Sequence, residues 1–146
     1  MTSVAQILKA KSDRTVHTIS GAATVYEAVK RMAAENIGAL VVIEGEHPVG
    51  IVTERDYARK IVLMNRSSKD TLVREIMSAP VMHVYPAQES AECMALMTDK
   101  RVRHLPVMEG GRLVGIVSIG DLVKDIISEQ EFVIRQLEHY IAGDRG

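Results

Sequence analysis

GIVTERD at residues 50–56 returns as GIVSIGD at residues 115–121, an offset of 65 residues (115 − 50). On both sides of this segment the same offset pairs further identical residues without a gap. These pairs are Val16 with Val81, Ala22 with Ala87, Glu27 with Glu92, Met32 with Met97, Leu40 with Leu105, Val42 with Val107, Val49 with Val114 and Ile61 with Ile126. Because self-similarity at one period marks a repeat architecture, the chain is a duplication of one unit.

The apolar periodicity changes within each unit in a readable order. Residues 16–20 alternate like a strand, and Thr24 followed by Glu27 predicts a capping box that opens an amphipathic helix. The β-branched run at 39–43 is typical of a strand covered on both faces. The first unit therefore reads as β-α-β-β-α, with elements at 16–20, 25–32, 39–43, 49–52 and 53–64. The second repeats this order at 82–86, 89–102, 104–108, 112–117 and 118–128.

A shorter echo precedes each unit, since TSVAQIL at 2–8 resembles TLVREIM at 71–77. Each unit thus has its own lead-in segment in the sequence. Two units with one-sided sheets bury their apolar faces against each other, which predicts an α+β fold with pseudo-two-fold symmetry. The expected division is a first repeat with lead-in at 1–64, a linker at 65–70, a second repeat with lead-in at 71–127, and a C-terminal helix and tail at 128–146.

Composition narrows the class of protein. A chain of 146 residues with 47% hydrophobic content can close one core, and a net charge of −1 offers no basic field for nucleic acid or an anionic membrane. No stretch approaches a membrane span or a signal peptide, and a single cysteine, Cys93, cannot form an internal disulfide. We expect a cytoplasmic protein without a nucleic-acid or membrane partner.

The duplicated units resemble tandem cystathionine-β-synthase (CBS) domains, the paired form of which is called a Bateman module. The resemblance covers residues 2 to about 127 and is carried by the two G-h-h-[ST]-x-x-D segments (h, hydrophobic) and by RHLP at 103–106. It implies a regulatory module whose ligand is AMP, ADP, ATP, S-adenosylmethionine or, more rarely, an NAD-type dinucleotide, bound in a cleft between the repeats.

Thr53 and Asp56 end a strand and open a helix in the first unit, as Ser118 and Asp121 do in the second. Free N–H groups at a helix N-terminus favour an anionic ligand, and a carboxylate there can accept hydrogen bonds from both ribose hydroxyls. The same [ST]-x-x-D pattern is also a capping box, and capping and binding can coexist.

The two copies differ around these positions. Arg55 aligns with Gly120, so the first helix start is charged and the second is open. In the segment before the second strand, Arg103 and His104 replace Gly38 and Ala39 and add two potential phosphate donors to the second unit. We therefore expect the two clefts to differ in affinity or in ligand.

By the resemblance, adenine is held by backbone groups of the first strand of a unit and of the segment before its second strand. With the helix starts, the expected nucleotide-binding residues are Thr18, Ile19, Ser20, Gly38, Ala39, Thr53, Arg55, Asp56, His83, Val84, Tyr85, Arg103, His104, Pro106, Ser118, Ile119 and Asp121. We expect no catalytic residues and no metal site, because neither a nucleophile-plus-base set nor a metal-ligand spacing occurs.

The leading functional hypothesis is a nucleotide sensor, not an enzyme, that signals to a protein partner. An NAD-type sensor, an accessory subunit of an enzyme and a purely structural dimerisation module are the alternatives. We expect a homodimer that covers apolar residues including Ile61, Val62, Ile126 and Ile127. A terminal helix at 128–142 would pack on its own chain or on a second subunit.

Overall fold

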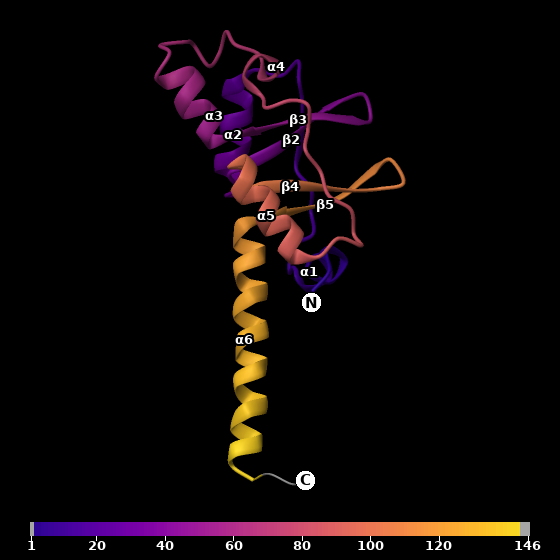
Figure 1. Ribbon diagram of the computed structural model, residues 1–146. Coiled ribbons are helices and arrows are strands. Elements are labelled where there is room, and N and C mark those ends of the chain that lie inside the picture. The colour runs from indigo at the N-terminus through magenta and orange to yellow at the C-terminus, as the bar shows by residue number, and fades with distance from the viewer. Residues whose placement is uncertain (1, 144–146) are drawn as a thin grey trace.

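The computed structural model describes residues 2–143, which form two stacked repeats and one long helix that projects from them (Figure 1). The hairpins of the two repeats lie side by side, and each has its helices at one end. Of the expected C-terminal tail, residues 144–146 lie outside the described residues. The α+β arrangement expected from the duplication is confirmed.

The first repeat has a three-stranded sheet in the order β1-β2-β3, in which β1 pairs parallel and β3 antiparallel with β2. Helix α2 begins after Thr24, whose hydroxyl accepts from the Glu27 amide as the capping pattern predicts. The elements are β1 (Thr18–Ser20), α2 (Val25–Glu35), β2 (Ala39–Glu44), β3 (His47–Thr53), α3 (Glu54–Tyr57) and η1 (Ala58–Val62).

The second repeat has a two-stranded sheet. The prediction of a first strand at 82–86 is therefore wrong. Only Val84 pairs there, in an isolated parallel bridge with Val107. The neighbours of Val84, His83 and Tyr85, are exposed and do not extend the ladder. The elements are α5 (Ser90–Lys100), β4 (His104–Glu109), β5 (Arg112–Ser118) and α6 (Ile119–Ile141).

The helix expected over 53–64 is interrupted. It begins as α3 and continues as a π-helical turn, η1, before ending near Leu63. The Lys60 side chain reaches from η1 to the carbonyl of Ile76, and Ile61 is buried in the first core. Because Ile61 belongs to that core, its expected place on a dimer surface is wrong.

The lead-in segments cross between the repeats: each precedes one unit in the sequence and packs on the core of the other. Helix α1 (Val4–Ala10) buries Val4 and Ile7 in the core of the second repeat. Helix α4 (Val73–Ile76) buries Val73 and Ile76 in the core of the first. Each crossing is held by backbone hydrogen bonds, such as Val4 N–H to Gln88 O (2.8 Å) on one side. The crossing ties the two repeats together.

Linker residues 65–70 also pack on the first repeat, where the Ser68 carbonyl accepts from the Tyr26 amide. The lone cysteine, Cys93, lies fully buried in the second core, and burial raises the pKa of its thiol. Cys93 is therefore a packing residue.

Helix α6 runs unbroken from Ile119 to Ile141, so the terminal helix expected from residue 128 is the continuation of the last helix of the second repeat. No glycine or proline separates the two parts. Leu122 is buried in the second core, whereas the later turns extend away from the body (Figure 1). Within residues 2–143, no helix combines the length and the apolar character needed to cross a membrane.

Candidate functional site between the repeats

Two equivalent helix starts face the interior of the molecule, and each is closed by a capping box. In the second repeat the Ser118 amide donates to Asp121 Oδ2 (2.8 Å) and the Asp121 amide donates to Ser118 Oγ (3.2 Å). Thr53 and Asp56 exchange the same bonds at 3.0 and 3.1 Å in the first. Both [ST]-x-x-D segments therefore act as caps, whatever else they do.

Asp56 and Asp121 each bind a lysine, but the lysine contacts a different oxygen in each. Lys60 Nζ lies 3.2 Å from Asp56 Oδ1, while Thr53 contacts Asp56 Oδ2, so both oxygens of Asp56 are engaged. Asp121 receives Lys11 Nζ at 3.0 Å on Oδ2, the oxygen that already accepts from the Ser118 amide. Among the described residues nothing contacts Asp121 Oδ1, which leaves that oxygen free to accept.

Lys11 belongs to the crossed lead-in and reaches the second repeat from the end of α1. Its Nζ also donates to the carbonyl of Ile116 in β5 (2.8 Å). The segment that follows Lys11 runs back to β1 and lines a cavity of about 310 Å³ between the repeats. The cavity is lined by Lys11, Asp13, Thr15, His17, Ile37, Gly38, Ala39, His104, Ile116 and Ser118.

The protonation states in this cleft follow from burial and from Lys11. Burial of Asp121 opposes ionisation, but hydrogen bonds from the Ser118 amide and from Lys11 outweigh it and lower the pKa of Asp121. Burial also lowers the pKa of His104, and the attraction of Asp121 does not compensate. The cleft therefore presents an ionised carboxylate and a neutral imidazole at pH 7.

The corresponding region beside Asp56 is arranged differently. The Ser78 and Ile51 backbones exchange hydrogen bonds of 2.9 and 3.1 Å, so the segment that follows α4 pairs with β3. Strand β3 is the counterpart of β5 in the first repeat. Arg103, exposed, stands where the first repeat has Gly38, and Arg55 Nη1 donates to the Arg101 carbonyl (3.4 Å). Among the described residues, the region beside Asp56 therefore has no counterpart of Lys11 and none of Gly38.

Four of the expected site residues line the one cavity: Gly38 and Ala39 from the first repeat with His104 and Ser118 from the second. Asp121 adjoins it through its contacts with Ser118 and Lys11. The cleft thus combines the β2 start of one repeat with the helix start of the other.

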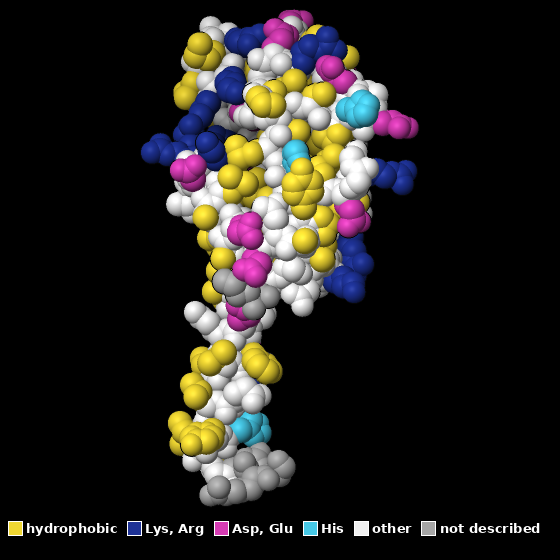
Figure 2. Space-filling view, turned by 45° about the vertical axis from the view of Figure 1, so that its right-hand side comes forward, with side chains coloured by type: hydrophobic (Ala, Val, Ile, Leu, Met, Phe, Trp, Pro, Cys, Tyr) yellow, Lys and Arg dark blue, Asp and Glu magenta, His cyan; other side chains and the backbone are white. Residues whose placement is uncertain are grey.

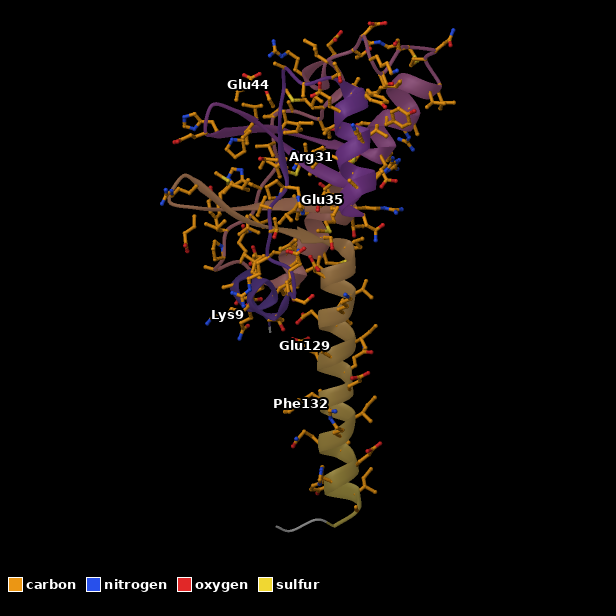
Figure 3. The ribbon with its side chains drawn as sticks, turned by 180° about the vertical axis from the view of Figure 1, so that it is seen from behind. Lys9, Arg31, Glu35, Glu44, Glu129 and Phe132 are labelled. Atoms are coloured by element: carbon orange, nitrogen blue, oxygen red, sulfur yellow. The ribbon has the colours of Figure 1, made fainter. Side chains whose placement is uncertain are left out.

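The other expected residues lie elsewhere. In β1, Ile19 is buried in the first core and the Thr18 carbonyl accepts from Arg31 (2.8 Å), a side chain labelled in Figure 3. Val84 is core, and the exposed His83 and Tyr85 rings pack edge to face. Of the remaining ones, Ser20, Arg55 and Arg103 are exposed. Pro106 is buried in β4, and Ile119 packs on the second core. Thr53 and Asp56 form the cap of α3.

Six lining residues were not expected from the sequence: Lys11, Asp13, Thr15, His17, Ile37 and Ile116. The sequence could have indicated Ile37 and Ile116, because they lie within two residues of the expected site residues Gly38 and Ser118. Nothing local marks the segment 11–17, because its place depends on the crossing of α1. Among residues 2–143, no group of histidine, cysteine and carboxylate side chains could hold a metal ion.

The chain matches known proteins over most of its length. The family model described as CBS domain matches the chain twice, at residues 4–63 and 73–128. The mitochondrial CBS domain-containing protein CBSX3 of Arabidopsis thaliana is 46% identical over 125 residues, which are 82% of this chain and 61% of the relative. The chain thus spans less than two thirds of that relative.

Solved structures repeat the arrangement. A protein of Burkholderia ambifaria described as a signal-transduction protein with CBS domains is 60% identical, with a TM-score of 0.85 over 88% of this chain and 96% of that one. A hexameric CBS-CP12 protein from bloom-forming cyanobacteria is 28% identical, with a TM-score of 0.76 over 100% of this chain and 89% of that one.

A third structure holds ligands. The CBS domain pair of MJ0100, in complex with 5′-methylthioadenosine and S-adenosyl-L-methionine, has a TM-score of 0.77 over 88% of this chain and 98% of that one. At 24% identity this likeness shows the fold alone.

Proposed function

Because the chain belongs to the CBS-domain family as a tandem pair, we propose that it is a regulatory module that binds an adenosine-containing ligand in the cleft beside Asp121. The observation that carries the proposal is an ionised Asp121 that is bound through Oδ2 to Lys11 and Ser118, two residues in the lining of a cavity of about 310 Å³. Ligand cavities in proteins begin at about this size.

The ribose is proposed to bind at Asp121. Lys11 and the Ser118 amide hold Oδ2, so the carboxylate is fixed in orientation while Oδ1 remains available for a ribose hydroxyl. Lys11 also carries a positive charge into the cleft, where it can attract a phosphate or another anionic group on the sugar. Asp121 therefore serves both as the cap of α6 and as the sugar acceptor.

The base is proposed to lie between the two repeats. Ile37 comes from the segment before β2 and Ile116 from β5, and together they give the cavity an apolar lining that suits a flat ring. Gly38 and Ala39 bring main-chain groups to the same cavity with little side-chain bulk. His104 is neutral there, so one ring nitrogen can donate and the other can accept.

Several adenosine ligands suit this description. AMP, ADP and ATP are the first candidates, and an NAD-type dinucleotide is the alternative. S-adenosylmethionine stays a candidate, since the MJ0100 pair is in complex with it. The remaining expected residues, around Asp56, are proposed as a weaker second site, because both oxygens of Asp56 already have partners.

We propose regulation and not catalysis as the output. The cleft takes Gly38 from one repeat and Ser118 from the other, so a ligand that binds both stabilises one relative placement of the repeats. That placement can be read by a protein partner or by a second copy of the chain. Self-association is favoured by the hexameric cyanobacterial relative. For the location we propose the cytoplasm, although the Arabidopsis relative is named as mitochondrial.

The direct test is to identify what the protein holds. Mass spectrometry of small molecules released from freshly purified protein, followed by calorimetry with AMP, ATP, NAD and S-adenosylmethionine, is expected to give a stoichiometric adenosine ligand without turnover. Steady conversion of the ligand would indicate an enzyme instead. The absence of binding by all four would contradict the sensor.

A further inference from the structure

Helix α6 carries an apolar stripe that its own chain does not cover. Glu129 accepts a hydrogen bond from the Thr2 hydroxyl, and from there the helix continues to Ile141. Those twelve residues extend about 18 Å at 1.5 Å per residue. Figure 2 shows hydrophobic side chains gathered along this projecting part, and Figure 3 shows Glu129 and Phe132 on it.

The stripe consists of eight large apolar side chains that are 39–84% exposed. They recur at spacings of three and four residues, which places them on one face of the helix. They are Val123, Ile126, Ile127, Val133, Ile134, Leu137, Tyr140 and Ile141. The opposite face is mostly polar, with Lys124, Ser128, Glu131, Arg135 and Glu138, and it also carries the exposed Phe132.

The stripe continues a face that is already an interface. At its start Ile119 and Leu122 pack against the second core, and the chain supplies a partner for those first turns only. From Val123 onward the large apolar side chains on this side of the helix are 39% exposed or more, so no element among the described residues covers them fully. A face of this kind is completed by another helix that carries a matching stripe.

We propose that α6 is a self-association element whose stripe packs against the α6 stripe of a second copy of this chain. The available area is sufficient. At ~25 cal/mol/Å², burying a whole Val or Leu side chain removes roughly 60–120 Å² from water. The eight side chains are only partly exposed, so those of two copies together offer on the order of 550–1,100 Å² of apolar area. Apolar area makes up about 60% of an interface, so the total is roughly 900–1,800 Å². Specific interfaces need about 1,200 Å².

Gln130 favours a second copy over an unrelated apolar surface. It lies within the stripe, four residues before Ile134 and three before Val133. Its amide both donates and accepts, so it can be satisfied by a polar partner at the facing position. A second α6 presents its own Gln130, whereas a wholly apolar surface would leave the amide unsatisfied at a cost.

This inference gives a site to the self-association proposed above and does not depend on which nucleotide binds. The experiment measures the ligand-free full-length protein by sedimentation equilibrium from one to one hundred micromolar. Leu137→Lys and Ile134→Lys place a charge within the stripe. Ser128→Lys adds the same charge on the polar face and is the matched control. Both stripe positions are more than half exposed, so the body folds in either variant.

We expect wild type and Ser128→Lys to reach at least twice the 16.1 kDa of one chain. The two stripe variants should raise the dissociation constant at least tenfold. A monomeric wild type over the whole range would overturn the proposal, as would an oligomer that Leu137→Lys and Ile134→Lys leave unchanged. Co-sedimentation of a monomer with anionic vesicles would assign the stripe to a lipid surface instead. Calorimetry with AMP on the same variants reports the cleft separately.

Discussion

Lys11 Nζ lies 3.0 Å from Asp121 Oδ2, and this ion pair joins the end of the N-terminal helix to the start of the last one. The two side chains are 20% and 15% exposed, so the pair is shielded from water on most sides. It holds the crossed lead-in on the second repeat and orients the carboxylate at the cleft. The relationship leads to the first two predictions.

Lys11→Met should destabilise the fold by about 1–3 kcal/mol, between the values for exposed and buried ion pairs. The reason is that Asp121 stays partly buried and loses the cation that pairs with it. Thermal unfolding measures the effect as a lowered Tm. The matched control is Lys9→Met, because Lys9 is exposed on α1 (Figure 3) and forms no ion pair within residues 2–143. Equal melting temperatures for both variants would show that the pair contributes nothing.

Asp121→Asn should weaken adenosine-ligand binding about tenfold or more. A charged acceptor is replaced by a neutral amide, and charge-assisted hydrogen bonds contribute ~1.5–3 kcal/mol, where ~1.4 kcal/mol corresponds to tenfold. Isothermal titration well below the melting temperature measures this effect apart from any loss of stability.

Asp56→Asn is the matched control for that variant, since Asp56 closes the same kind of cap in the other repeat. Lys60 and Thr53 already occupy both of its oxygens, so the change should affect affinity less than twofold. If the two variants bound equally well, the assignment of the ribose to Asp121 would fail.

His104 should make stability depend on pH between neutrality and mild acid. Its pKa in the fold lies below the ordinary value of 6.5 because burial disfavours the charged ring. Below that value the unfolded chain therefore binds more protons than the folded one, and stability is lost as the pH falls from 6.5 through the lowered pKa. Melting temperatures at pH 7.5 and 5.5 should differ less for His104→Gln than for wild type. His47→Gln, at the exposed start of β3, should behave like wild type.

Glycines at equivalent places in the two repeats test the crossed lead-ins. A β-carbon at Gly50 would lie 2.8 Å from the Ser78 carbonyl oxygen, whereas one at Gly115 would lie 2.8 Å from a terminal methyl of Leu8. A backbone atom cannot turn aside as a leucine methyl can. Gly50→Ala should therefore cost about 1–3 kcal/mol, and Gly115→Ala clearly less. Chemical denaturation gives both values, and the reverse order would contradict the packing of the lead-ins.

Local pattern was enough to predict the repeat and most of its elements. The repeat is visible as a 65-residue offset. The N-cap at Thr24, the capping box at Ser118 and the alternating strands all act within a few residues, where backbone preference and side-chain periodicity dominate. The expected strand at 82–86 failed because only Val84 found a partner, in Val107. Strand pairing depends on neighbours that are distant in sequence.

The sequence by itself therefore determined two units, their element order and the carboxylates at their helix starts. Only the tertiary structure decided that α1 crosses to the second repeat, that Lys11 joins Asp121 and that Gly38 faces Ser118 across a cleft. These outcomes rest on which of two similar cores accepts each lead-in. Because both lead-ins carry the same apolar pattern, that choice is made by packing and hydrogen bonding between distant segments and leaves no mark in the local sequence.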